Sequence, residues 1–254
     1  MTGLQAITLD LWGTILQPRD AEAKIERRLA LLLEALAEAR CPVDAATLRE
    51  AYQAAEAILE ANIGTQCRDI GPLGCWRVLA ERLGLPPTLV PTARLVAAYE
   101  DLTLEFLPGL MPGAGAAIQR LAGAYRLALI CNTMYTRGQV LREVLRRHGL
   151  ADCFQAFIFS DEVGCVKPEP RIFRQALAQL GVEAAVALHV GEVEALDAQG
   201  ARAAGMRAAR YLPSGPAPTG ADLVFHHWDD FEARLASWAA TSPARGEVGT
   251  VHGG

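Results

Sequence analysis

Four short clusters of polar residues in this chain have side chains that could carry out chemistry. In chain order they are Asp10-Leu11-Trp12-Gly13-Thr14, Cys131-Asn132-Thr133, Lys167-Pro168, and Gly191-Glu192 followed by Asp197. They offer a carboxylate at a sharp turn, a hydrogen-bonding amide, a lysine and two further acids. A carboxylate nucleophile needs a cation to neutralise an anionic substrate, and donors for the oxygens that gain charge. An all-oxygen acidic cluster also suits Mg²⁺, which leaves room for substrate oxygens.

Each cluster follows a short apolar run that is typical of a buried strand. We predict strands over residues 4–9, 126–130, 156–159, 187–190, 208–211 and 223–225. Helices are predicted over residues 114–121, 138–147, 170–181 and 195–204, with a last helix from near residue 229. This alternation favours a parallel sheet covered on both faces. The carboxyl ends of parallel strands would then bring the four clusters together at one edge.

A helical block separates the first strand from the others. Apolar residues recur at helical spacing between residues 21 and 99, and Asp44 is placed to cap a helix over residues 45–61. Gly71-Pro72 and Pro86-Pro87 punctuate two more helices. We therefore predict an α/β fold with a Rossmann-like core (residues 1–17 and 109–241) and a helical cap domain (residues 18–108). The polar, Gly-rich residues 242–254 are expected to be a disordered tail, because they offer little apolar area to offset the entropy of ordering.

The four clusters, in this order and with a helical insert after the first, resemble the haloacid dehalogenase-like hydrolase superfamily. The resemblance covers roughly residues 4–235 and includes the phrases SDEVGCVKPEPRIF and VGE…D…GARAAGMRA. It implies that Asp10 attacks the substrate and becomes a covalent aspartyl ester. It also implies that Lys167 is catalytic, because it matches the lysine that orients the nucleophile and the substrate anion.

The resemblance also assigns roles to the residues around the nucleophile. It implies that substrate is bound or positioned by Trp12, Thr14, Cys131 and Asn132. Among these, Thr14 matches a threonine that is mainly structural. A Mg²⁺ ion, which the phosphatases of the superfamily use as a cofactor, would be held by Asp10, Glu192 and Asp197.

Trp12 is the first of three departures from the superfamily pattern. The phosphatases usually carry a second Asp at this position as general acid, a role worth roughly 10²–10⁴-fold in rate, and indole cannot transfer a proton at neutral pH. The superfamily's 2-haloacid dehalogenases carry Tyr there, and halide leaves without a proton. However, they have small polar residues where Glu192 and Glu194 stand, and Tyr where Phe173 stands. The extra acid favours a metal, and a metal favours phosphate.

The other two departures are Glu192, one methylene longer than the usual Asp, and Cys131, a weaker donor than the usual Ser or Thr. Three functions therefore stay open, in this order. The first is a Mg²⁺-dependent phosphatase of a small phosphorylated metabolite. The second is a metal-independent hydrolase of the dehalogenase type. The third is a catalytically degenerate binding or regulatory module.

Some of these residues also have ordinary structural interpretations. Asp197 is equally suited to hydrogen-bonding the loop around Asp10, and Glu194 to the start of a helix. His189, within a predicted strand, is interpreted as a buried core histidine. In the helical block, Trp76 and Arg77 could contact substrate, although an arginine on a helix usually faces solvent.

Composition excludes several other classes of protein. A net charge of −5 argues against a general nucleic-acid binder. No apolar run is long enough to span a bilayer, and the N-terminus lacks the pattern of a secretory signal. The six cysteines form no CxxC pair and have no zinc-like spacing, as in a reducing compartment. We therefore expect a cytoplasmic protein with a small-molecule substrate and no membrane or nucleic-acid partner.

Overall fold

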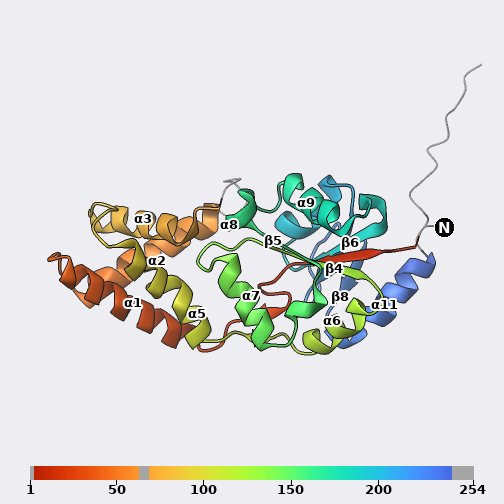
Figure 1. Ribbon diagram of the computed structural model, residues 1–254, viewed down its shortest axis with the longest axis horizontal. Coiled ribbons are helices and arrows are strands. Elements are labelled where there is room, and N and C mark those ends of the chain that lie inside the picture. Colours follow the sequence, from red (N-terminus) through yellow and green to blue (C-terminus); the bar gives the residue numbers. More distant parts are fainter. Residues whose placement is uncertain (1–2, 63–68, 242–254) are drawn as a thin grey trace, which may run out of the picture.

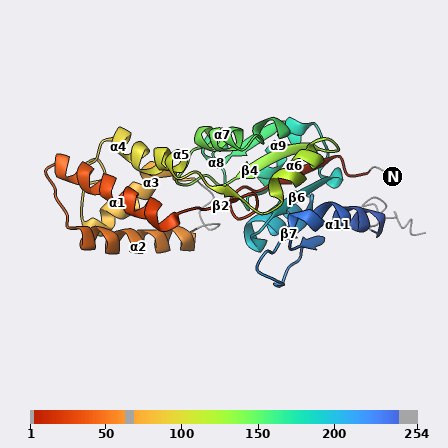
Figure 2. The same ribbon diagram turned by 90° about the horizontal axis from the view of Figure 1, so that it is seen from below.

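A computed structural model of the chain describes residues 3–62 and 69–241 (Figure 1). The tail predicted over residues 242–254 lies outside this range. Within it, no helix is both long and apolar enough to cross a membrane. The two ribbon views place a group of helices at one end of an elongated molecule and an α/β core at the other (Figures 1 and 2).

The core is built on a six-stranded parallel sheet in the order β5-β4-β1-β6-β7-β8. The strands are β1 (Ala6–Leu9), β4 (Arg126–Cys131), β5 (Ala156–Phe159), β6 (Ala187–Gly191), β7 (Arg207–Tyr211) and β8 (Leu223–Phe225). They match the predicted strands to within about two residues, as expected of boundaries read from a pattern. The first strand therefore lies at the centre of the sheet, between two strands that end in predicted site residues.

Helices cover both faces of this sheet, as predicted. One face packs against α6 (Ala114–Ala122), α7 (Gly138–Arg147) and α11 (Trp228–Thr241). The other packs against α9 (Pro170–Leu180) and α10 (Gln199–Ala203). Strand side chains alternate between the two faces, with Leu127 and Leu129 on the first and Ala128 and Ile130 on the second.

The helical insert, which we define as residues 21–105, follows β1 in the chain. It contains α1 (Ala21–Glu38), α2 (Ala45–Asn62), α3 (Gly71–Leu83), α4 (Thr92–Val96), the π-helical turn η1 (Ala97–Asp101) and α5 (Leu102–Glu105). These helices bury a hydrophobic cluster of their own, in which Leu36, Leu48 and Leu79 are almost completely buried. Asp44 caps α2 as predicted, since its carboxylate accepts hydrogen bonds from the backbone and side chain of Thr47.

A short ribbon joins the insert to the core. Its two antiparallel strands, β2 (Leu16–Gln17) and β3 (Gly109–Leu110), lie just before and just after the insert. Other short elements were also not predicted: α8 (Ser160–Val163), η2 (Ala151–Cys153) and η3 (Ala184–Val186). The helix predicted over residues 195–204 is two elements, a π-helical turn η4 (Glu194–Ala198) followed by α10. Runs this short carry too few residues to show a period.

Candidate active site

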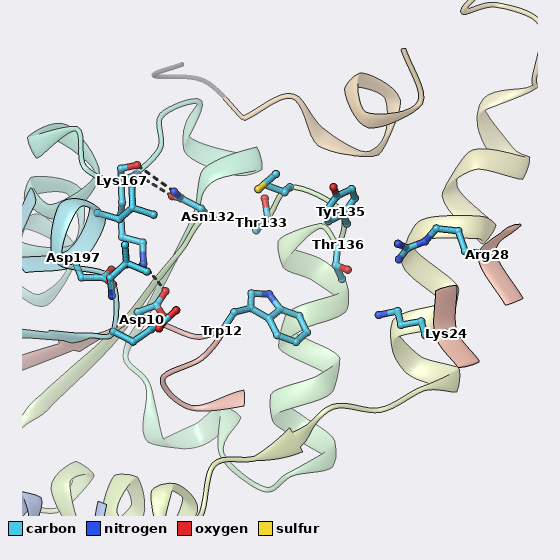
Figure 3. Close-up of a pocket in the computed structure, with 14 residues that line it drawn as sticks. Asp10, Trp12, Lys24, Arg28, Asn132, Thr133, Tyr135, Thr136, Lys167 and Asp197 are labelled. Carbon is cyan, nitrogen blue, oxygen red and sulfur yellow. Dashed lines mark hydrogen bonds and ion pairs between the residues drawn. The ribbon is translucent and has the colours of Figure 1, made fainter. Parts of the chain in front are cut away.

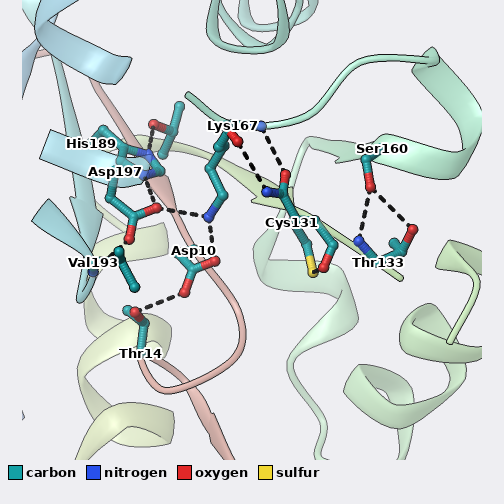
Figure 4. A network of polar contacts seen from close by, with 11 residues as sticks. Asp10, Thr14, Cys131, Thr133, Ser160, Lys167, His189, Val193 and Asp197 are labelled. Atoms are coloured by element: carbon teal, nitrogen blue, oxygen red, sulfur yellow. Dashed lines mark hydrogen bonds and ion pairs between the residues drawn. The ribbon is translucent and has the colours of Figure 1, made fainter. Parts of the chain in front are cut away.

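Three of the four predicted clusters meet around one lysine (Figure 4). Lys167 Nζ donates to Asp10 Oδ1, and lies 2.7 Å from Asp197 Oδ1. The second oxygen of Asp10 accepts a hydrogen bond of 2.9 Å from the Thr14 hydroxyl. Asp10, Lys167 and Asp197 are all at least nine-tenths buried. The structure therefore brings together the nucleophile, lysine and acid that the sequence predicts at the strand ends.

The turn after β1 explains why Asp10 is presented at this point. The ladder to β6 continues through a backbone hydrogen bond from Asp10 N to Val190 O, 2.9 Å long, so the two strands end side by side. Gly13 then has a φ of +74°, in the left-handed region that favours glycine. A Cβ at Gly13 would lie 2.6 Å from Glu192 Oε1. The positive φ therefore favours glycine at this turn, and a side chain at residue 13 would displace the Glu192 carboxylate from its place beside it.

Lys167 contacts both acids, but the pKa values of Asp10 and Asp197 shift in opposite directions. Burial and the charge of Asp197 raise the pKa of Asp10, although Lys167 opposes this. Burial would also raise the pKa of Asp197, but Lys167 and His189 outweigh it and hold that pKa below its usual value. Burial alone would lower the pKa of Lys167, and the two carboxylates reverse this and raise it. Asp197 is the more firmly ionised of the two acids, and Asp10 is the more basic.

Asp197 has little capacity left for a metal. Its Oδ1 also lies 3.3 Å from His189 Nε2, and its Oδ2 accepts a hydrogen bond of 2.8 Å from Val193 N. His189 is fully buried, and its Nδ1 lies 2.8 Å from the Thr8 hydroxyl. Burial lowers the pKa of His189. The interpretation of His189 as a core histidine fits this placement. The histidine also contacts the Asp197 carboxylate and helps to orient it.

The second cluster supports the lysine through the backbone. The Asn132 amide accepts a hydrogen bond of 2.8 Å from Lys167 N and donates one of 3.2 Å to Lys167 O. Cys131 packs into the core under the sheet edge and is 1% exposed. Burial and the charge of Asp10 raise the pKa of its thiol well above the usual range. Asn132 therefore positions Lys167, while the Cys131 thiol is a neutral part of the core.

A cavity of about 390 Å³ opens over these residues (Figure 3). Asp10, Trp12, Asn132 and Lys167 line it, whereas Thr14 and Cys131, which were predicted to contact substrate, lie beneath its wall. Across the cavity it is lined by Lys24 and Arg28 of α1 and by residues 133–136 of the core.

The sequence did not identify the residues of the insert that face the cavity. The suggested Trp76 is buried among the helices, where its indole N–H donates to Pro87 O at 2.7 Å, and Arg77 does not line the cavity. The four-residue spacing of Lys24 and Arg28 places them on one face of α1. That spacing alone does not say which way the face points, because this depends on how the insert packs on the core.

Glu192 is the carboxylate best placed to complete a metal site with Asp10. Both residues line the cavity, and no described residue donates a hydrogen bond to the Glu192 carboxylate. Burial and the charge of Asp197 raise the pKa of Glu192. Among residues 3–62 and 69–241, no three His, Cys, Asp or Glu side chains form a metal cluster by themselves. Mg²⁺, however, is commonly held by one or two carboxylates together with water and substrate phosphate. Asp10 and Glu192 therefore fit it as a pair, without Asp197.

A hydrogen-bonded cluster joins the insert to the core beside the cavity. Asp69, just before α3, accepts hydrogen bonds from Ser160 Oγ, from Thr133 Oγ1 at 2.6 Å and from Met134 N at 3.2 Å. Ser160 Oγ also accepts a hydrogen bond of 2.8 Å from Thr133 N. One carboxylate of the insert thus holds the core loop that forms a wall of the cavity.

Comparisons with known proteins agree with this geometry. A family model described as haloacid dehalogenase-like hydrolase matches residues 4–205. The mouse protein named haloacid dehalogenase-like hydrolase domain-containing protein 3 is 36% identical over 137 residues, or 53% of this chain and 52% of that protein. A glyceraldehyde 3-phosphate phosphatase of Methanopyrus kandleri is 30% identical over 132 residues, or 51% of this chain and 54% of that protein. The chain thus spans about half the length of these curated relatives.

A solved structure extends the likeness over most of the chain. The 2-haloacid dehalogenase from Pseudomonas syringae pv. Tomato DC3000 superposes with a TM-score of 0.67 and 25% identity. The match covers 92% of this chain and 99% of that one, so it includes the helical insert as well as the sheet.

Proposed function

The chain belongs to the haloacid dehalogenase-like hydrolases, and from that premise we propose that it is a Mg²⁺-dependent phosphatase of a small phosphorylated metabolite. The observation that carries the proposal is Glu192, which lines the same cavity as Asp10 and whose carboxylate accepts no hydrogen bond from residues 3–62 or 69–241. A metal-independent hydrolase has no use for a second free acid beside its nucleophile. Relatives named as phosphatases support the same activity.

Asp10 is the nucleophile in this proposal. Lys167 and Thr14 each hold one of its oxygens, so the carboxylate enters the reaction already oriented. A carboxylate oxygen forms a bond to phosphorus while the bond from phosphorus to the leaving oxygen breaks. This gives an aspartyl phosphate and the leaving group as its anion, which takes a proton from water. Water then attacks that phosphorus, releasing phosphate and the free Asp10 carboxylate. The raised pKa of Asp10 makes it a more basic nucleophile than an exposed aspartate.

The other residues of the cavity bind and orient the substrate and the metal ion. Lys167 supplies a positive charge beside the transferred group, and Asn132 fixes the backbone from which it extends. Asp10 and Glu192 would hold the Mg²⁺, which when bound neutralises the charge of the phosphoryl oxygens. The helical insert serves as a cap over the cavity, with α1 opposite the nucleophile, and excludes water from it.

The test uses p-nitrophenyl phosphate and acetyl phosphate, whose leaving groups do not need a general acid. Turnover is expected with Mg²⁺ and is expected to be lost in EDTA. Asp10→Asn keeps the shape of the side chain and is expected to lower kcat by roughly a thousandfold or more. Turnover that survives EDTA unchanged would exclude the metal-dependent reaction. No turnover with any substrate would leave a binding or regulatory module.

A metal-independent dehalogenase is the second candidate, and Trp12 favours it. The indole lines the cavity where a phosphatase of this superfamily usually has a proton donor. In that reaction Asp10 attacks carbon, halide leaves without a proton, and water opens the ester. Release of halide from a short 2-haloacid in EDTA, lost in Asp10→Asn, would establish this reaction in place of the first.

A further inference from the structure

Two cations of α1 enter the cavity from the side opposite Asp10. Lys24 and Arg28 are one helical turn apart, and Figure 3 shows both side chains reaching across the cavity towards the sheet, with Trp12 between them and Asp10. Neither forms an ion pair with an acid anywhere in the described part of the chain. Neither charge is therefore directly paired with an acid among residues 3–62 and 69–241.

Arg28 is held in position by aromatic rings. Its guanidinium lies 4.9 Å from the ring centre of Tyr99, 5.5 Å from that of Tyr135 and 5.9 Å from that of Tyr52. It is 6% exposed, with Nε donating to Ala98 O at 3.3 Å and Nη1 to the Tyr52 hydroxyl at 2.5 Å. Its Nη2 has no donor contact to any described residue.

This arrangement does not neutralise the charge of Arg28. Glu56, the acid beside these tyrosines, accepts a hydrogen bond from the Tyr135 hydroxyl, and its charge also acts on Tyr52 and Tyr99. It forms no direct ion pair with Arg28. Ring faces attract a cation, but less strongly than a carboxylate or phosphate does in a desolvated site. A buried guanidinium fixed by rings and retaining a free N–H edge is preorganised for an anion.

Lys24 adds a second donor beside it. Its Nζ donates to the Thr103 hydroxyl at 2.9 Å, and that hydroxyl lies 2.8 Å from the Thr136 hydroxyl of the core. An ammonium has three N–H donors, so two remain for a ligand. Burial, with a smaller effect of the Arg28 charge, lowers the pKa of Lys24 to about 8. The lysine is therefore partly desolvated, and an anion bound beside it would stabilise its protonated form.

We propose that Lys24 and Arg28 bind a second anionic group of the substrate, so that the cavity selects small phosphate esters that also carry a carboxylate or a second phosphate. This rests on the proposed function, which places the scissile phosphate at Asp10 and Lys167. A substrate with a neutral tail would leave two cations, neither in an ion pair with a described acid, inside a cavity of about 390 Å³. A doubly anionic substrate matches the charges at both ends.

Three aryl phosphates that differ by one substituent measure how much a second anionic group contributes to binding. 4-Nitrophenyl phosphate has only the ester phosphate, 3-carboxy-4-nitrophenyl phosphate adds a carboxylate, and the 3-phosphono analogue adds a phosphonate in its place. Calorimetry measures the Kd of each for the full chain carrying Asp10→Asn, which binds without turnover. Charge-assisted contacts are worth roughly 10- to 100-fold in affinity. At least one of the two doubly anionic esters is therefore expected to bind about tenfold or more tightly than the plain ester, and the tighter of the two identifies the class.

Substitutions in α1 test whether Lys24 and Arg28 cause the preference for doubly anionic esters. Adding Lys24→Met or Arg28→Met is expected to bring the Kd ratio to within about threefold of one, because each removes one charge from the second site. Arg27→Met is the matched control. Arg27 is exposed on the same helix near Glu105, and its loss is expected to keep the ratio. Thermal melting checks folding, and the less buried Lys24 keeps the test decisive if Arg28→Met unfolds.

The outcomes separate the two proposals. Equal Kd values for all three esters, no binding, or a preference that both Met variants retain would overturn the second anion site. A tenfold preference in binding, with no turnover of any ester by the wild-type chain, would support the site and overturn the phosphatase activity.

Discussion

Trp12 is the residue that most restricts the chemistry available to Asp10. It packs on the core cluster beneath and lines the cavity above, at the sequence position where the superfamily's phosphatases usually carry a proton donor. An enzyme without a general acid depends on leaving groups that depart as stable anions. We therefore predict that the wild-type protein hydrolyses p-nitrophenyl phosphate much faster than an alkyl phosphate such as glycerol 3-phosphate.

A proton donor at residue 12 should reduce the difference in rate between aryl and alkyl phosphates. Trp12→Asp is expected to raise the alkyl-to-aryl ratio of kcat/KM by roughly 10²-fold, the lower end of what general acid catalysis supplies. Trp12→Asn is the control, because it removes the same ring and the same packing but cannot donate a proton as an acid. Equal ratios in the Asp and Asn variants would show that residue 12 acts through shape alone.

Lys24 predicts a pH dependence for the second anion site. Its pKa is lowered to about 8, so the ammonium is charged below that pH and neutral above it. Among the described residues, the one charged group that contributes to this shift is Arg28, while the facing Thr103 and Thr136 hydroxyls do not titrate in this range. In Asp10→Asn, the affinity for the carboxylated ester is expected to be constant from pH 6.5 to about 7.5 and to fall as the pH rises through 8.

An arginine at residue 24 supplies the control for this pH profile. Guanidinium stays protonated to above about pH 12, so Lys24→Arg should bind the carboxylated ester with a flat profile up to pH 9.5. The plain ester should show no step at pH 8 in either protein. A step that persists in Lys24→Arg would assign the titration to another group.

At the scale of elements, the link between Asp69 and the core predicts how the insert is held. Asp69→Ala removes the acceptor for Ser160, Thr133 and Met134 N, and leaving such donors unpaired costs about 1–3 kcal/mol. We expect a KM for p-nitrophenyl phosphate raised by roughly tenfold, together with a larger radius of gyration in solution scattering. Asp44→Ala, on an exposed cap of α2, should change neither. An unchanged scattering curve for Asp69→Ala would contradict the role of Asp69 as a link.

The sequence was enough to predict which residues meet at the strand ends. It was not enough to predict the directions in which the side chains of the connecting segments and of the insert point. Asp10 and Lys167 could be brought together from sequence, because polar residues after parallel strands must meet at one edge. The direction of Asp197 could not, since it depends on the π-helical turn that aims it back at Lys167. Likewise, Lys24 and Arg28 share a face by their spacing, but only the packing of α1 against the core loop directs that face to the cavity.

At the scale of the whole molecule, the hydrophobic clusters of the insert and of the sheet are separate. Leu36 lies in the first and Leu129 in the second, and both are fully buried. Replacing either by Ala should cost about 2–5 kcal/mol. Hydrogen exchange in Leu36→Ala is expected to accelerate in α1–α3 far more than in β1 and β4, with the reverse pattern in Leu129→Ala. Equal acceleration in both regions would show that the molecule opens as one cooperative unit.

The ribbon of β2 and β3 has an evolutionary consequence. Because these strands are paired, the chain leaves the core and returns to it at neighbouring points, Leu16 opposite Leu110 and Gln17 opposite Gly109. The helices between them can lengthen, shorten or be replaced without moving the strand that presents Asp10. Recombination that exchanged this one continuous stretch of gene would change the residues that face Asp10 across the cavity and leave β1 and β6 in place.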